Sequence, residues 1–183
     1  ATAATSLPAK SAFARMPVTY LDSGSTHPMS LGAKAGLEEY LRLKTQDGSV
    51  QGYSVSVMEK AVLASFGRLI GAQPEELSFV QSTTMGENLV LKALGLPQRG
   101  GRIVTDALHF FGSHYTYGEL VKAGMEVVTV PMTREGGVDM AAMAAAVNAR
   151  TRLVAVSHVS TINGFEHDLK KVADLAHAHG APV

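Results

Sequence analysis

Cysteine is absent from the 183-residue chain, which excludes both a disulfide and a cysteine nucleophile within these residues. This absence does not assign a redox compartment, because a protein without cysteine suits either side of a membrane. The formal net charge is zero, so no basic excess indicates a nucleic-acid partner. No apolar run approaches the roughly 20 residues that a membrane-spanning helix needs, so we expect no membrane partner.

The opening of the chain, residues 1–17, lacks hydrophobic periodicity and is rich in alanine, threonine and serine as far as Ser11. We interpret it as an N-terminal arm that precedes one domain over residues 18–183. With 46% apolar residues in the whole chain, this domain is able to bury a substantial core. We expect a cytoplasmic protein; a periplasmic location after removal of a signal peptide is the alternative.

Hydrophobic patterning predicts helices that alternate with short apolar strands. The predicted helices cover residues 30–41, 56–70, 88–94, 115–123, 140–147 and 169–179. The predicted strands cover residues 18–21, 77–80, 102–105, 126–130 and 153–159, with another beginning at 181. This alternation is typical of an α/β fold with a mostly parallel, open sheet flanked by helices.

A hydroxyl-rich turn at residues 81–84 separates the strand at 77–80 from the helix at 88–94. Such a turn presents backbone N–H groups and hydroxyls at a helix N-terminus, where the helix dipole also favours an anion. A phosphate is the usual occupant of such a place. The alternative is structural, with Thr84 capping the helix and Glu87 as its reciprocal partner in a capping box.

Ligands of open α/β sheets gather beyond the carboxyl ends of the strands. Three polar turns leave such ends, at residues 81–84, 106–114 and 157–164, and together they predict a ligand site. We expect no metal site, because His177 and His179 are spaced so that they do not share one face of a helix.

Several segments keep the order and spacing of a known family between residues 18 and 183. They are Tyr20-Leu21-Asp22-Ser23-Gly24-Ser25-Thr26, residues 76–84 with Asn88, His109, Ser157-His158-Val159-Ser160 with Gly164, and residues 175–183. These segments resemble the class V aminotransferases, enzymes of fold type I that depend on pyridoxal 5'-phosphate (PLP). The family includes cysteine desulfurases and isopenicillin N epimerase-like proteins. The resemblance implies a PLP-binding large domain that is incomplete at its C-terminal side.

The resemblance assigns cofactor contacts to two of the polar turns. Thr83 and Thr84 match the family's turn that holds the PLP phosphate, and Thr84 is the stronger match because a threonine follows a small residue there. His109 matches the aromatic residue, often histidine, that stacks on the cofactor ring. A flat imidazole there is also able to move protons near the substrate carbon, so His109 is the candidate catalytic residue. His114 is the alternative for the same role.

The third polar turn departs from the desulfurase pattern. Thr161 stands where many desulfurases carry an asparagine that contacts the phenolic oxygen of PLP, and Asn163 follows two positions later. Either residue is a candidate for this contact, and we slightly favour Asn163.

The resemblance also implies residues on the substrate side. Gly24, Ser25 and Thr26 match the segment that lines the substrate pocket, and Tyr53 stands where relatives reach the neighbouring subunit's site. We therefore expect an amino-acid or amine substrate and a homodimer.

The residues that would complete a PLP site lie beyond Val183 in the resembling family. They are the aspartate that pairs with the pyridine nitrogen, the Schiff-base lysine and the arginine that holds the substrate carboxylate. Lys170 and Lys171 precede the matching strand, so neither is the catalytic lysine. We expect this segment to need the remaining C-terminal part of the same enzyme and to be inactive alone.

The combined expectation is a PLP-dependent enzyme that acts on an amino acid or amine. We favour isopenicillin N epimerase-like, lyase or aminotransferase chemistry, because of the Ser-Gly-Ser-Thr start and the missing asparagine. The alternatives are a cysteine desulfurase and a non-catalytic α/β module that binds a phosphate or nucleotide.

Overall fold

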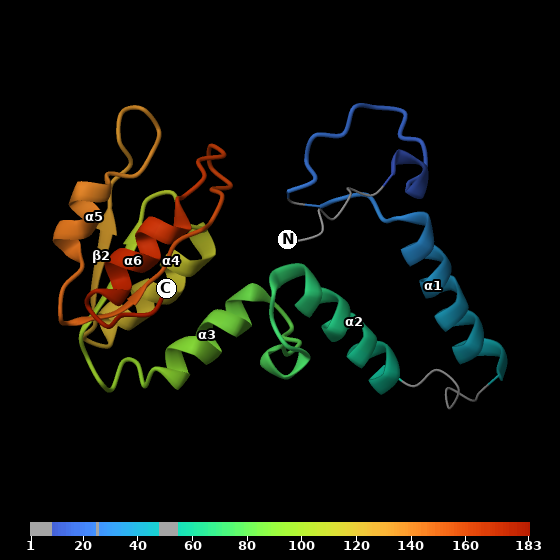
Figure 1. The fold of residues 1–183 in the computed structure, drawn as a ribbon, viewed down its shortest axis with the longest axis horizontal. Coiled ribbons are helices and arrows are strands. Elements are labelled where there is room, and N and C mark those ends of the chain that lie inside the picture. Colours follow the sequence, from blue (N-terminus) through green and yellow to red (C-terminus); the bar gives the residue numbers. More distant parts are fainter. Residues whose placement is uncertain (1–8, 25, 48–54) are drawn as a thin grey trace. The chain divides into compact units, whose positions relative to one another are not determined.

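The computed structural model describes residues 9–24, 26–47 and 55–183, and the chain divides into two compact units (Figure 1). The first unit ends at Phe79, and the second extends from Val80 to Val183. The sequence-based division into an arm over residues 1–17 and a domain over 18–183 stays a prediction. The three polar turns that follow expected strands, at residues 81–84, 106–114 and 157–164, all belong to the second unit.

The first unit contains helices joined by irregular segments in its described part, and the two helices predicted for it are confirmed. Ser30 is the N-cap of the first of them, because its Oγ accepts a hydrogen bond from the N–H of Ala33 at 3.1 Å. The elements are η1 (Lys10–Ala12), α1 (Leu31–Arg42), η2 (Leu43–Asp47), α2 (Val55–Ile70) and η4 (Pro74–Glu76).

The second unit is organised on a three-stranded parallel sheet of order β2-β1-β3. Val104 of the central strand pairs with Val128 on one side and with Val154 on the other. The strands are β1 (Arg102–Asp106), β2 (Glu126–Val130) and β3 (Thr151–Val154). An open parallel α/β sheet is therefore confirmed.

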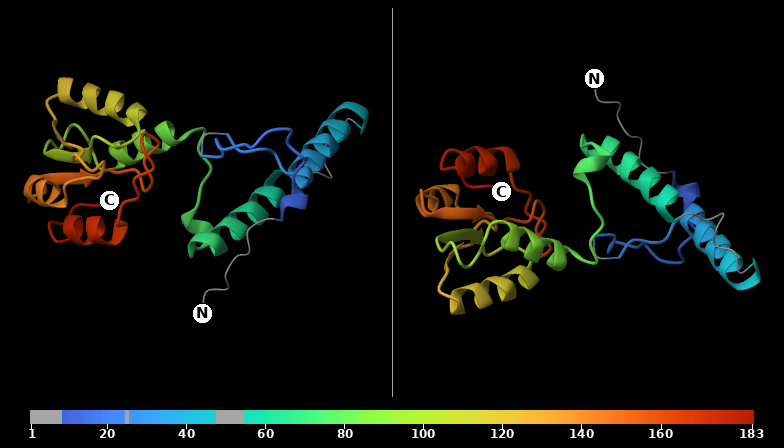
Figure 2. Two further views of the ribbon diagram at one scale, coloured as in Figure 1. Left: turned by 90° about the horizontal axis from the view of Figure 1, so that it is seen from above. Right: turned by 90° about the horizontal axis from the view of Figure 1, so that it is seen from below.

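Helices cover both faces of this sheet. Figure 2 shows α4 on one face of the sheet, with α5 and α6 on the other. The helices of the unit are α3 (Thr83–Ala93), α4 (Phe111–Lys122), α5 (Met140–Ala146) and α6 (Leu169–His177).

Alternate residues of the strands supply two separate cores. Ile103 and Leu153 pack with Leu91 of α3 and Tyr117 of α4. Their neighbours Val104 and Val154 point to the opposite face and pack with Met143 of α5 and Val172 of α6. This alternation follows from the two-residue period of a strand and explains why the central strand is apolar throughout.

Three predicted strands are absent from the described structure, and one has different bounds. Residues 18–21 and 77–80 pair with no neighbouring strand, so they form no β-ladder. The strand predicted to begin at 181 is not formed either, although the Pro182 carbonyl accepts from the N–H of Val154 at 3.0 Å. The strand predicted at 153–159 begins at Thr151 and ends at Val154, and Val159 instead makes an isolated antiparallel bridge with Glu166. An apolar run becomes a strand only where tertiary structure supplies a partner for its backbone.

Within the described ranges, each helix is either too short or too polar to cross a membrane.

The central strand generates a stability prediction. Ile103 is 0% exposed, so Ile103→Ala leaves a cavity between the sheet and two helices. We expect a loss of about 2–5 kcal/mol in the free energy of unfolding, measured by urea denaturation. The matched control is Ile162→Ala, because Ile162 is 60% exposed, and it should change stability by no more than about 0.5 kcal/mol. Equal effects of the two substitutions would contradict this packing.

Candidate functional site

A pocket of about 680 Å³ lies in the second unit, between the start of α3, the segment that leaves β1, and β3. Ser82 and Thr83 line it together with His109, which follows the carboxyl end of β1. Its other walls are largely apolar and include Val80, Val90 and residues 153–156. Two of the three predicted polar turns therefore meet at one cavity, as expected for the carboxyl ends of parallel strands.

The N-terminus of α3 is open toward an external acceptor. The first N–H groups of a helix have no intrahelical acceptor. Ser82 is the N-cap, and its Oγ accepts from the N–H of Met85 at 3.1 Å. No hydrogen bond between described residues engages the N–H groups of Thr83 or Thr84. These two groups remain available to an anion.

The capping box considered from the sequence is wrong. Ser82, not Thr84, occupies the cap position of α3. The Glu87 side chain does not return to the cap either: its carboxylate accepts from Ser113 Oγ at 2.9 Å and from Tyr117 Oη at 2.5 Å. The glutamate that resembled a capping partner is used instead to join α3 to α4.

His109 is held at both ring nitrogens. It is 9% exposed, and its Nδ1 lies 2.9 Å from Ser157 Oγ in the segment after β3. Its Nε2 lies 3.4 Å from Tyr117 Oη. The rings of His109 and Tyr117 are nearly parallel, at 15°, with centroids 6.1 Å apart. His114, the alternative to His109, lies edge-on to His109 at 6.0 Å.

Burial shifts the ionisation of this cluster. Burial is the largest cause that lowers the pKa of His109, and the nearby carboxylates of Glu87 and Asp106 oppose it. Burial, followed by the hydrogen bond to Glu87, raises the pKa of the Tyr117 phenol far above its usual value. The imidazole is therefore neutral and the phenol protonated at neutral pH.

A buried pair fixes the end of β1, from which His109 follows. Asp106 and His167 are 0% and 3% exposed, and Asp106 Oδ2 lies 3.2 Å from His167 Nε2. These two atoms are close enough for an ion pair but are poorly aligned for a hydrogen bond. Asp106 Oδ1 accepts from the N–H of Leu108 at 2.8 Å, and the Asp106 carbonyl accepts from the N–H of His109 at 3.2 Å.

Sequence patterns did not identify the roles of Glu87, Ser113, Tyr117 and Ser157. Ser113 and Tyr117 lie four residues apart on α4, so both face the same neighbour. That spacing is the only signal in the sequence that could have pointed to a shared partner for them.

The remaining predicted residues lie elsewhere. Asn163 uses its side-chain amide to hold a turn, donating to the Gly136 carbonyl at 2.7 Å and accepting from the N–H of Phe165 at 3.0 Å. Thr161 is exposed. Neither residue lines the pocket around His109, so the choice between them as a cofactor contact stays a prediction.

The predicted substrate-side residues belong to the first unit. Gly24 and Thr26 are exposed, and the Thr26 carbonyl accepts from the phenol of Tyr20. Ser25 and Tyr53 lie outside the described residues. In the part of the chain that the structure describes, no group of three or more His, Asp and Glu side chains could hold a metal ion.

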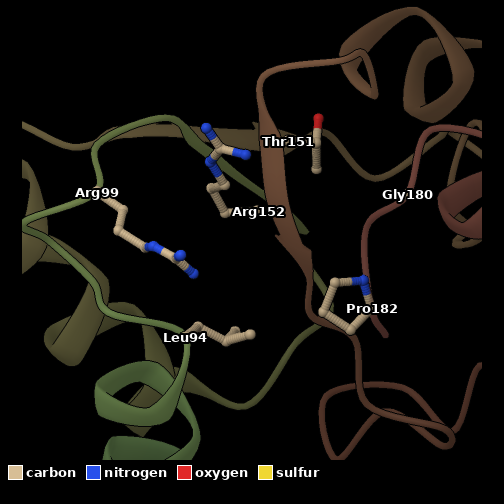
Figure 3. A pocket seen from close by; sticks show the side chains of 6 residues that line it. All are labelled: Leu94, Arg99, Thr151, Arg152, Gly180 and Pro182. Atoms are coloured by element: carbon tan, nitrogen blue, oxygen red, sulfur yellow. The ribbon is translucent and has the colours of Figure 1, made fainter.

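A second pocket, of about 430 Å³, lies at the amino end of β3, where Thr151 begins the strand (Figure 3). Arg99 and Arg152 line it, together with Leu94 and Pro182. The carboxyl ends of the strands, where His109 and Ser157 lie, are at the opposite edge of the sheet. This second pocket is therefore separate from the candidate site.

The fold and the pocket define a class of protein: an open parallel α/β domain with a helix N-terminus ready for an anion at the carboxyl edge of its sheet. The chain belongs to the class V aminotransferase family, whose family model, Aminotransferase class-V, matches residues 19–183. Members of this family are PLP-dependent enzymes.

Two curated relatives are described as a cysteine desulfurase and a probable cysteine desulfurase. One from Dickeya dadantii (strain 3937) is 31% identical over 91% of this chain and 42% of its own length. A probable cysteine desulfurase from Halalkalibacterium halodurans is 25% identical over 90% of this chain and 43% of its own length. The chain thus spans under half the length of these relatives.

Solved structures support the same fold. A structure described as "SspA in complex with cysteine" is matched with a TM-score of 0.69 and 20% identity, over 80% of this chain and 45% of the other. A "NIFS-LIKE PROTEIN" is matched with a TM-score of 0.68 and 19% identity, over 79% and 42%.

The lowered pKa of His109 predicts a pH dependence. In the unfolded chain this imidazole has its ordinary pKa of 6.5, and in the folded protein its pKa is lower. As pH falls through about 6.5 and on through the folded pKa, the unfolded chain therefore binds a proton more readily, and His109 lowers the free energy of unfolding. His109→Gln should therefore flatten the fall in unfolding free energy between about pH 7 and pH 5. Urea denaturation at several pH values measures this effect.

The matched control for this measurement is His177→Gln, because His177 is exposed at the end of α6. It should keep the pH dependence of the parent protein. If His109→Gln kept that dependence as well, burial would not be shifting the pKa of His109.

Proposed function

We propose that the pocket binds PLP, with its phosphate at the start of α3 and its ring against His109, in an enzyme that acts on an amino acid or amine. One observation carries the proposal: the start of α3, where Thr83 lines the pocket and Thr84 follows it outside the lining, has free N–H groups and meets the imidazole of His109 at the same pocket. The family match supports the choice of PLP over another phosphate compound.

The residues present fit the cofactor chemically. A phosphate dianion suits a helix N-terminus, where unpaired N–H groups and the helix dipole both favour negative charge. The hydroxyls of Ser82, Thr83 and Thr84 add donors at the same end. A flat ring suits the neutral imidazole of His109 and the apolar walls formed by residues such as Val90 and Val156.

The residues of this chain would bind and orient the cofactor. When bound, PLP supplies the electron sink for a carbanion next to the substrate nitrogen. The start of α3 would anchor one end of the cofactor. His109 would fix the plane of the ring, and an imidazole that lines the pocket is a residue type able to hold or move a proton. Asn163 or Thr161 remains our candidate for the phenolic oxygen.

We further propose that the rest of the site comes from chain outside these residues. It would supply the lysine that attaches the cofactor, the aspartate for the pyridine nitrogen and the arginine for the substrate carboxylate. The segment alone would then be inactive. Gly24, Ser25, Thr26 and Tyr53 remain candidates for substrate contacts in a homodimer, which we expect in the cytoplasm or, alternatively, in the periplasm.

The reaction we favour is isopenicillin N epimerase-like, lyase or aminotransferase chemistry, because Thr161 replaces the asparagine expected of a desulfurase. Cysteine desulfuration is the second candidate, favoured by the two curated relatives described above, a cysteine desulfurase at 31% identity and a probable one at 25%.

A test of the phosphate anchor uses Thr84→Val in the complete protein. Removal of a hydroxyl that donates to a charged phosphate should cost about 1.5–3 kcal/mol of PLP binding, or roughly a 10- to 150-fold higher dissociation constant. The change in PLP absorbance on titration measures it. Thr129→Val, at an exposed position of β2, is the matched control and should bind PLP normally. Unchanged binding by Thr84→Val would reject the anchor, and no PLP binding by the parent protein would favour a different phosphate ligand.

A test of the reaction follows products of the complete, PLP-loaded protein. Incubation with amino acids in D2O should give deuterium at the α-carbon, followed by the opposite enantiomer or a keto acid, as monitored by NMR and chiral chromatography. Release of sulfide and alanine from L-cysteine as the dominant reaction would reverse our order of the two candidates.

A further inference from the structure

We propose that Glu87 is a positioning residue that acts through Tyr117 to fix the tautomer of His109, with the ring proton on Nε2. The role of this tautomer in the enzyme rests on the proposed function, because His109 is the residue assigned to the cofactor ring. The contacts themselves do not depend on a cofactor. They run from Glu87 in α3 through Tyr117 in α4 to His109 in the segment after β1.

The direction of the first hydrogen bond follows from the chemistry of its partners. An ionised carboxylate only accepts hydrogen bonds, and Glu87 Oε1 lies 2.5 Å from Tyr117 Oη. The single phenol proton of Tyr117 is therefore donated to Glu87. The Tyr117 oxygen is left as an acceptor toward His109 Nε2, 3.4 Å away, and this contact is favourable only if Nε2 carries a proton.

The other side of the ring is compatible with the same tautomer. Ser157 Oγ accepts the backbone N–H of Phe110 at 3.2 Å, and its own hydroxyl proton is free to point elsewhere. His109 Nδ1 lies 2.9 Å from that oxygen, and an unprotonated Nδ1 accepts the Ser157 hydroxyl proton. The Nε2–H form therefore satisfies both contacts, whereas a proton on Nδ1 alone would leave Nε2 and the Tyr117 oxygen facing each other as two acceptors.

Several ionisable groups face His109, and they must be considered together. Glu87 comes from α3, Asp106 from β1, His114 from α4 and His167 from the segment before α6. Burial has the largest effect on the pKa of His109 and lowers it, while the two carboxylates raise it. The pKa of the Tyr117 phenol is raised, so this phenol keeps its proton and its bond to Glu87 at ordinary pH.

This hydrogen-bonding pattern determines which part of His109 is available to a ligand. Both nitrogens are engaged by protein, so His109 would meet a ligand in the pocket that it lines through its ring rather than through a hydrogen bond from a free nitrogen. Any proton added at Nδ1 gives a cation that the Glu87 charge stabilises through Tyr117. Glu87 thus links the helix that would anchor the phosphate to the residue that would face the ring, which couples the two halves of the site.

The test measures the two imidazole nitrogens of His109 by 15N NMR in the protein without added cofactor. The parent protein should show a protonated Nε2 and an unprotonated Nδ1. Glu87→Gln should mix the tautomers, because the amide is able to donate to Tyr117 and let the phenol donate to Nε2. It should also move the titration midpoint of His109 to lower pH, because a carboxylate that favours the cation is lost.

Three further variants keep the test sharp. Tyr117→Phe removes the intermediary and should also release the tautomer, so the test does not depend on the folding of one variant. Ser157→Ala should instead shift the Nδ1 signal, because that nitrogen loses its donor. Glu119→Gln is the matched control: its carboxylate is exposed on α4, 72% by side chain, and pairs with Lys122, so His109 should be unchanged.

The proposal is overturned if Nδ1 carries the proton in the parent protein. It is also overturned if Glu87→Gln and Tyr117→Phe both leave the nitrogen shifts and midpoint equal to those of Glu119→Gln. Failure of the proposed function would look different, because Thr84→Val would then leave PLP binding intact, or no PLP would bind, whatever the tautomer of His109.

Discussion

The burial of β1 between two strands and two layers of helices is the constraint on which the second unit depends. Its residues Val104, Thr105 and Asp106 are all 0% exposed, and parallel partners flank it on both sides. Because the strand cannot shift without exposing both cores, its carboxyl end is fixed. The buried contact between Asp106 and His167 then sets the direction in which the chain leaves the strand toward His109.

Glu87 is the second organising feature, because its side chain bonds to another helix and not to the N-terminus of its own helix. A carboxylate in the first turns of a helix is stabilised by the helix dipole in any case. Here it also accepts two hydrogen bonds from α4, from residues 26 and 30 positions away in the sequence. The anion-ready start of α3 is thereby attached to the neighbourhood of His109, which makes one pocket from two separate turns.

Much of the fold could be predicted from the sequence, and the errors have a common cause. Helical periodicity located α1, α2, α5 and α6 closely, because an amphipathic pattern reports the face that must be buried. The strands at 102–106 and 126–130 were also found. The runs at 18–21 and 77–80 have equally apolar residues but no partner among the described residues, and pairing is not encoded in the run itself.

The sequence by itself determined the fold class and the family, since these depend on residue type, order and spacing. It also brought Thr83, Thr84 and His109 into consideration for one site. Only the tertiary structure decided that Ser82 caps α3, that Glu87 turns to Tyr117, and that Ser157 meets His109. The physical reason is that a hydrogen bond has a range of about 3 Å, so its partner is chosen by how the elements pack and not by neighbours along the chain.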